Sequence, residues 1–209
     1  MKPALFAFAA AGILALAGAM GYAPSPASPV GPSAMATGQR MYKVDPIHSS
    51  IVFKVGYLGV ANFYGRFNDV RGKFSLDFDE PAQSVLDVRV IAGSVDTNEA
   101  ERDKQLRGES FFSSKEFPEI RFKGEQFRAI DSTHMDVQGS LAMRGVRKPA
   151  HVTLTWIGDR ADPLGGYRGG WETLLTIQRS DFGVNYGLQD GVLSDEISII
   201  VAVSGLNKK

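Results

Sequence analysis

Apolar and polar residues alternate along most of the chain from Met41 onward. In the first long example, Ile51, Phe53, Val55 and Tyr57 share one face and Lys54 lies on the other. A period of two is typical of strands with one buried face. Comparable segments occur at 66–78, 86–92, 118–123, 133–144, 146–157, 171–179 and 197–204, separated by loops that include 58–65 and the Gly-rich stretch 161–170.

This pattern predicts an all-β fold of about eight long strands. Strands that follow one another directly in the chain usually pair as antiparallel neighbours. A sheet of this size has exposed edges unless it closes on itself. We therefore predict that the strands form a closed antiparallel barrel.

One short helix is predicted to interrupt the strands, from Asn98 to about Arg107. Asn98 is placed to cap its start, with Glu101 three residues later, and Gly108 follows its end. A helix of about ten residues gains most of its stability by docking. The helical segment near 98–112 is therefore expected to pack on the barrel.

The docked face of this helix has few apolar side chains. Leu106 is its one large apolar residue, so Phe111 and Phe112 are expected to help it pack. Arg102 lies four residues before Leu106 and shares its face. The neighbouring Asp103 is read either as half of a surface ion pair or as part of a site.

The N-terminus has the composition of a secretory signal peptide. Lys2 is followed by an apolar run at 4–16 and by small residues, with plausible cleavage after Ala19, Ala23 or Ala36. The run is short for a membrane span, so an uncleaved anchor is the less favoured alternative. We predict a signal peptide at 1–23, a disordered Pro/Ala/Ser-rich spacer at 24–40, and a barrel domain at 41–209 of a periplasmic protein.

Composition excludes several classes of function. The chain has 209 residues, a formal net charge of zero and no cysteine. It therefore has no broad basic field for nucleic acid, no disulfide, no thiolate metal site and no thiol nucleophile. Its three histidines, His48, His134 and His151, lack metal-ligand spacing, and no catalytic motif is present, so neither a metal nor a catalytic residue is predicted. The nearby Asp45 and His48 are expected to form a cap or ion pair.

The inward faces carry many large side chains. Phe53, Tyr57, Phe74, Phe122, Met143 and Trp156 point inward, and Phe111, Phe112, Trp171 and Phe182 lie near strand ends. An eight-stranded barrel is either just filled by such side chains or holds one small ligand. Alternation alone leaves both possibilities open. In a hollow barrel, Arg102 and His48 would be the polar groups at the mouth of the pocket.

Several motifs in order resemble the YceI-like family of periplasmic, lipocalin-like polyisoprenoid-binding proteins. The resemblance covers Met41 to Asn207. It is carried by VDPIHSSIVF, YGRF with VRGKF, SVDTNEAERDKQLRGESFF with FPEIRF, VQGSLAMRGVRKPAHVTL, DPLGGYRGGWE, RSDFGV and SDEISIIVAVSG. It implies an extended eight-stranded antiparallel barrel around a long isoprenoid chain, as in a quinone or polyprenyl lipid, with no metal, no catalysis and a plausible homodimer.

The resemblance favours the hollow barrel and a binding role. It places polar contacts or ion pairs at His48, Arg102 and Asp103. We expect the cavity to be lined by Phe53, Val55, Tyr57, Phe74, Leu76, Leu106, Phe111, Phe112, Phe122, Met143, Trp156, Trp171 and Phe182.

The expected function is sequestration or transport of an isoprenoid lipid, which is the only bound group predicted. Transient contact with a membrane is also expected. Two alternatives stay open at this stage. One is an enzyme that acts on a lipid-linked substrate through His48 and Arg102, and the other is a stress-associated interaction protein with a packed barrel.

Overall fold

The computed structural model describes residues 40–208. The predicted signal peptide, and the predicted spacer up to residue 39, lie outside the described residues. The one α-helix of the described part is α1 (Ala100–Arg107), and its four short 3₁₀ helices are η1 (Pro46–His48), η2 (Pro81–Gln83), η3 (Ala92–Ser94) and η4 (Arg179–Phe182). The strands are β1 (Tyr42–Val44), β2 (Ser50–Tyr57), β3 (Ala61–Phe67), β4 (Val70–Ser75), β5 (Val85–Ile91), β6 (Val95–Asp96), β7 (Glu119–Ala129), β8 (His134–Met143), β9 (Val146–Ala161), β10 (Tyr167–Gln178) and β11 (Leu193–Asn207).

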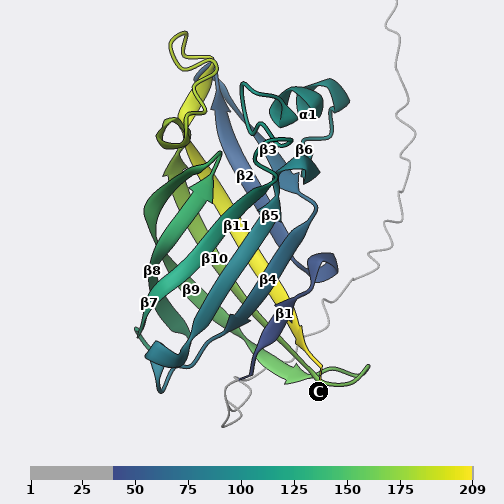
Figure 1. The fold of residues 1–209 in the computed structure, drawn as a ribbon, viewed down its shortest axis with the longest axis vertical. Coiled ribbons are helices and arrows are strands. Elements are labelled where there is room, and N and C mark those ends of the chain that lie inside the picture. The colour runs from purple at the N-terminus through teal and green to yellow at the C-terminus, as the bar shows by residue number, and fades with distance from the viewer. Residues whose placement is uncertain (1–39, 209) are drawn as a thin grey trace, which may run out of the picture. The chain divides into compact units, whose positions relative to one another are not determined.

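The strands close into one antiparallel barrel (Figure 1). Its ring runs β1-β4-β5-β7-β8-β9-β10-β11 and closes where β1 pairs with β11. Beyond β1, β11 pairs with β2, so β2 extends the position of β1 in the barrel. β3 pairs with β2, and β6 pairs with β3, so these two strands extend the positions of β4 and β5. The described residues thus form eight long strands around the barrel, three of which are interrupted: β1 with β2, β3 with β4, and β5 with β6. This confirms the predicted eight-stranded barrel with one helix.

Two segments predicted as loops are partly strand. Residues 61–67 form β3, which pairs with β2 from the Tyr57–Ala61 end to the Ile51–Phe67 end. The prediction was wrong here because the turn occupies only the few residues around Leu58 and Gly59, both with positive φ. Half of the Gly-rich stretch 161–170 is also strand, at Ala161 and at 167–170, because positive φ angles at Gly165 and Gly166 turn the chain tightly.

The end of the barrel that holds β1 is filled by aromatic rings. Tyr42 stacks on Phe74 with ring centroids 5.1 Å apart, and Trp156 and Trp171 pack edge-on against Phe74 at 6.3 and 6.1 Å. Gly205 makes room for them, since a Cβ there would lie 2.6 Å from the ring of Phe74. These rings form the bottom of the barrel interior.

Helix α1 lies at the opposite end of the barrel (Figure 1). The buried carboxylate of Asp103 accepts hydrogen bonds from the backbone N–H of Thr97 (2.8 Å) and from its hydroxyl (2.6 Å). Arg102 donates to the Thr97 hydroxyl and carbonyl, both at 2.8 Å. The pair Arg102–Asp103 therefore fixes the helix to the chain segment that precedes it.

The start of α1 differs from the predicted one. Glu99 is the N-cap, and its carboxylate accepts from the backbone N–H groups of Glu101 and Arg102. Asn98 instead has a left-handed φ of 61°, which lets the chain turn between β6 and the helix. Asp103 is not paired with Arg107, because Thr97 takes its carboxylate and Arg107 donates to the carbonyl of Val95.

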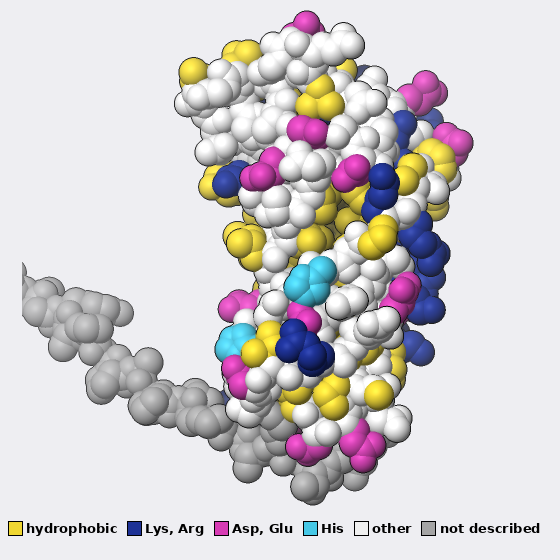
Figure 2. Space-filling model, turned by 90° about the vertical axis from the view of Figure 1, so that its left-hand side faces the viewer, with side chains coloured by type: hydrophobic (Ala, Val, Ile, Leu, Met, Phe, Trp, Pro, Cys, Tyr) yellow, Lys and Arg dark blue, Asp and Glu magenta, His cyan; other side chains and the backbone are white. Residues whose placement is uncertain are grey.

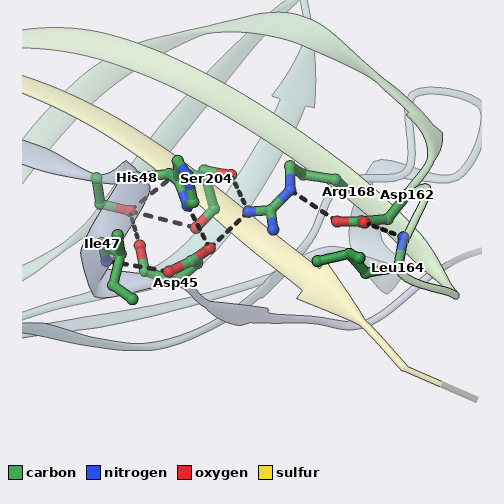
Figure 3. A network of polar contacts seen from close by, with 8 residues as sticks. Asp45, Ile47, His48, Asp162, Leu164, Arg168 and Ser204 are labelled. Carbon is green, nitrogen blue, oxygen red and sulfur yellow. Dashed lines mark hydrogen bonds and ion pairs between the residues drawn. The ribbon is translucent and has the colours of Figure 1, made fainter.

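A polar network holds the break between β1 and β2 (Figure 3). The Asp45 carboxylate contacts Arg168 of β10 at 2.6 Å and His48 at 2.8 Å, and accepts from the backbone N–H of Ile47 at 3.0 Å. Burial alone would raise the pKa of Asp45, but these bonds outweigh it and lower the pKa to about 2. Arg168 also binds Asp162, so the network ties the break to the turn between β9 and β10.

The outer face carries the charged residues that alternation places outward. Arg71, Arg89 and Arg121 follow one another across β4, β5 and β7 in register. Figure 2 shows Lys and Arg side chains gathered along one side of the barrel. The neutral overall composition therefore hides an uneven distribution of charge.

Replacement of Phe74 by Ala is expected to destabilise the barrel strongly. Phe74 is fully buried, and the cavity left by such a truncation costs about 3–5 kcal/mol. Urea unfolding would measure the free energy, with Ile157→Ala on the outer face of β9 as the control, expected to change it by no more than about 0.5 kcal/mol. Equal losses in the two variants would contradict the packed aromatic end.

Replacement of Asp103 by Ala is expected to loosen α1. It leaves the Thr97 N–H and hydroxyl without their acceptor, which costs about 1–3 kcal/mol. Urea unfolding and amide exchange of residues 97–107 would detect this, with the exposed Lys104→Ala as control. Unchanged exchange in Asp103→Ala would rule out this anchoring role.

The Asp45 network is expected to make stability depend on acid pH. Because the folded pKa lies below the ordinary value of 3.8, ionised Asp45 stabilises the fold above that pH, and the contribution is lost as pH falls from 3.8 toward about 2. The unfolding free energies of the wild type and Asp45→Asn should differ most above about pH 5 and converge near pH 2. A difference that does not vary with pH would contradict this.

Candidate functional site

The end of the barrel nearest α1 contains a cavity of about 650 Å³. Its walls are inward-facing aliphatic side chains from several strands, and α1 contributes Gln105 and Leu106. The aliphatic wall comprises Ile51, Val55, Leu86, Val88, Val90, Ile120, Leu141, Val152, Leu154, Leu175, Ile177, Ile197, Ile199 and Val201. The barrel is thus hollow at one end and filled at the other, which answers the question that alternation left open.

Side-chain size explains why only one end is hollow. At the β1 end, four large rings meet across the barrel interior. Toward α1, Val, Leu and Ile are the most frequent lining residues, and aromatic residues such as Phe53 and Phe122 line the cavity beside them without filling it. Trp171 belongs to both regions, since it packs on Phe74 and also lines the cavity. It therefore forms part of the cavity floor.

The mouth of the cavity is marked by lining residues that also reach solvent. Tyr57 at the end of β2 is 43% exposed, and Tyr186 after η4 is 49% exposed. Tyr186 packs against Phe111 with ring centroids 5.1 Å apart, which brings the segment after α1 against the loop before β11. The amides of Asn62 and Gln105 also line the cavity. Its interior is apolar and its polar groups are few.

The structure brings together most of the residues that were expected to line a pocket. The expected residues that line the cavity are Phe53, Val55, Tyr57, Leu106, Phe111, Phe112, Phe122, Met143 and Trp171. Arg102, expected at the pocket mouth, lines the cavity as well, with its guanidinium carbon 5.1 Å from the ring centroid of Phe63.

Four expected lining residues lie elsewhere. Phe74 and Trp156 belong to the aromatic packing at the β1 end, and Leu76 packs against the same cluster. Phe182 of η4 is buried in the cluster of apolar residues that also contains Leu106. The assignments of Phe74, Trp156 and Leu76 were wrong because alternation tells which face of a strand points inward but not at which height along the barrel. Phe182 lies outside the strands, so alternation gave no direction for its side chain.

His48 and Asp103 are also outside the cavity lining. His48 lies in the Asp45 network, with an exposed side chain 2.8 Å from the Asp45 carboxylate. Asp103 supports α1 through Thr97. Because His48 does not share the cavity with Arg102, the two residues required by the enzyme alternative do not form one site.

Arg179 lines the cavity and was not predicted. It is 4% exposed, and its guanidinium donates to the carbonyls of Ser194 and Val184, both at 2.8 Å, and of Leu193 at 3.2 Å. Burial lowers the pKa of Arg179. Position 179 keeps the two-residue phase of the inward residues Leu175 and Ile177, but a charged side chain at a strand end is usually exposed. The missed aliphatic residues of β9 and β11 also follow the alternating pattern.

The described residues provide no metal centre and no membrane-spanning helix. In residues 40–208, no three His, Asp or Glu side chains are arranged to hold a metal ion. None of the helices in this range is long and apolar enough to cross a membrane. The site chemistry visible here is an apolar enclosure with a few hydrogen-bonding groups and two guanidinium groups.

Sequence comparisons identify close relatives of this chain. The YceI-like domain matches residues 42–204. A UPF0312 protein of Pseudomonas aeruginosa is 36% identical over 184 residues, covering 86% of this chain and 95% of the relative. A UPF0312 protein of Shewanella oneidensis is 35% identical over 182 residues, covering 87% and 94%.

Solved structures share the fold. BcnA of Burkholderia cenocepacia has a TM-score of 0.69 at 20% identity, covering 77% of this chain and 98% of that protein. The YceI protein of Campylobacter jejuni has a TM-score of 0.62 at 27% identity, covering 72% and 88%. A polyisoprenoid-binding domain from Saccharophagus degradans has a TM-score of 0.60 at 13% identity, covering 79% and 98%. The sequence match over the whole barrel and the shared architecture show that the chain belongs to the YceI-like family.

Proposed function

We propose that this protein is an exported carrier that holds the apolar chain of an isoprenoid lipid inside its barrel. The observation that carries the proposal is the 650 Å³ cavity, whose volume lies within the range of small-molecule sites. A solved structure of the same fold is a polyisoprenoid-binding domain, which supports this ligand class. A quinone or a polyprenyl lipid has the required apolar tail.

The free energy of burial suits a carrier that releases its cargo. Eight isoprene units contain about 40 carbons, and full burial at roughly 0.8 kcal/mol each would give about 30 kcal/mol. Non-covalent affinity saturates near 20 kcal/mol. Ordering of the chain offsets part of the gain, and a long tail would leave part of its length outside the cavity.

Export and membrane contact belong to the same proposal. The signal-peptide pattern at the N-terminus supports export to the periplasm. Leu58 and Val60, at the turn after Tyr57, are 50% and 83% exposed beside the cavity mouth. These apolar side chains suit transient contact with a lipid surface during loading. The homodimer suggested by family resemblance stays a prediction.

Blocking the cavity is expected to weaken lipid uptake. Leu175 and Leu174 are adjacent on β10, but Leu175 lines the cavity whereas Leu174 is 66% exposed on the outside. Leu175→Trp should fill part of the cavity and weaken binding of a prenyl quinone at least about tenfold, while Leu174→Trp should bind like the wild type. Native mass spectrometry after incubation with the quinone would measure occupancy.

The matched pair makes the result easy to interpret. Thermal unfolding of both variants would show that each is folded. Absence of uptake by the folded wild type, for both a prenyl quinone and a prenyl phosphate, would reject the carrier proposal. Equal uptake by the two Trp variants would show that the ligand binds outside the barrel.

A further inference from the structure

The outer face of β1, β4, β5 and β7 carries a group of cationic side chains. We call this group the basic face, and it consists of Lys43, Arg71, Lys73, Arg89, Arg121 and Lys123. The strand register makes Arg71, Arg89 and Arg121 direct cross-strand neighbours, and it does the same for Lys43 and Lys73. Figure 2 shows Lys and Arg side chains gathered on one side of the barrel. Because the whole chain has no net charge, this side is cationic at the expense of the others.

Two of the six cations are matched by a carboxylate. Arg71 donates to both carboxylate oxygens of Asp69, at 2.9 and 2.7 Å. Arg121 donates to both oxygens of Asp87, at 2.8 and 2.6 Å. These two paired contacts neutralise the two arginines at the edges of the row and leave the central one without a close partner.

The other four cations are poorly compensated. Arg89 lies 3.5 Å from Glu119, and its Nε, which is shielded from solvent, has no hydrogen-bond partner among residues 40–208. In the same range, no carboxylate lies within ion-pair distance of Lys43, Lys73 or Lys123. Like charges placed directly opposite each other on a sheet are destabilising. The stability of the barrel therefore does not account for this arrangement.

The chemistry of the basic face suits a partner with many negative charges and no fixed shape. None of the large apolar side chains that are exposed in the described part of the chain lies on β1, β4, β5 or β7. Stable protein interfaces are built around buried apolar and aromatic residues, which this face does not offer. An anionic bilayer requires no such residues, because each Lys or Arg near its surface adds to the attraction.

We propose that the basic face docks the protein on bilayer surfaces that contain anionic phospholipids. The inference rests on the membrane contact included in the proposed function, but it does not depend on what the cavity holds. It also involves a different part of the molecule from the apolar turn of Leu58 and Val60. Electrostatic docking is reversible and is weakened by salt, so it keeps a carrier close to a membrane without anchoring it there.

The test is co-sedimentation of the exported protein with lipid vesicles of two compositions. One is phosphatidylcholine alone, and the other contains about one third phosphatidylglycerol, which supplies the negative charge. The wild type is expected to bind the anionic vesicles at least about tenfold more tightly than the neutral ones. Raising the salt concentration from about 50 mM to about 500 mM should remove most of this difference, because salt screens exposed charges.

Two double variants locate the contact. Lys73→Gln with Lys123→Gln removes two exposed charges of the basic face without breaking an ion pair, and it should weaken binding to anionic vesicles at least about tenfold. Lys104→Gln with Arg160→Gln is the charge-matched control, because these exposed residues lie on α1 and β9. The control should bind within about twofold of the wild type. Thermal unfolding of both double variants would show that they are folded.

The remaining outcomes separate this proposal from its alternatives. Equal weakening in the two double variants would show that only the total charge matters and would overturn the proposal. Equal binding of both kinds of vesicle by the wild type would overturn it in favour of the apolar turn. No binding to anionic vesicles would overturn it in favour of an acidic protein partner.

The carrier function is tested separately by uptake of a prenyl quinone. Binding to anionic vesicles through the basic face without any uptake would reject the carrier and support the docking surface. Uptake without preference for anionic vesicles would support the carrier and overturn the docking surface.

Discussion

The nearly constant width of an eight-stranded barrel is the constraint on which this structure depends. Within that width, the size of the inward side chains decides whether a given level is filled or hollow. At the β1 end, Tyr42, Phe74, Trp156 and Trp171 meet across the interior, and Gly205 gives them room. Toward α1, mainly aliphatic side chains, with several aromatic ones, surround the cavity without filling it. One end therefore provides stability and the other provides space.

The hollow end has its own apolar cluster, which includes Leu106 and Phe182, but the cavity interrupts its packing. Hydrogen bonds support this end at two places. Asp103 and Arg102 bind Thr97 and hold α1 near the mouth, and Arg179 binds three carbonyls of the segment that leads into β11. Two of these three residues also line the cavity. The groups that support the mouth thus set its charge as well.

This arrangement links the proposed ligand to the fold. The apolar wall favours a hydrocarbon chain, and the few polar groups that line the cavity can fix its orientation. The alternative of a packed barrel does not agree with a cavity of this size. The structure also separates Asp45 and the exposed His48 from the cavity lining, so the histidine of the VDPIHS segment has a role in the strand break and not in the cavity.

The sequence by itself determined the strands, the closed barrel, the single helix and most of the inward residues. Alternation is a local property, so Phe53, Val55 and Tyr57 could be assigned to the interior without any knowledge of their partners. The sequence did not reveal which of these residues would meet at one level of the barrel. Strand tilt and register set that level, so the tertiary structure moved Phe74 and Trp156 into the filled end. It also allowed the charged Arg179 to be buried in the cavity wall, because carbonyls of Leu193 and Ser194, distant in sequence, accept its hydrogen bonds.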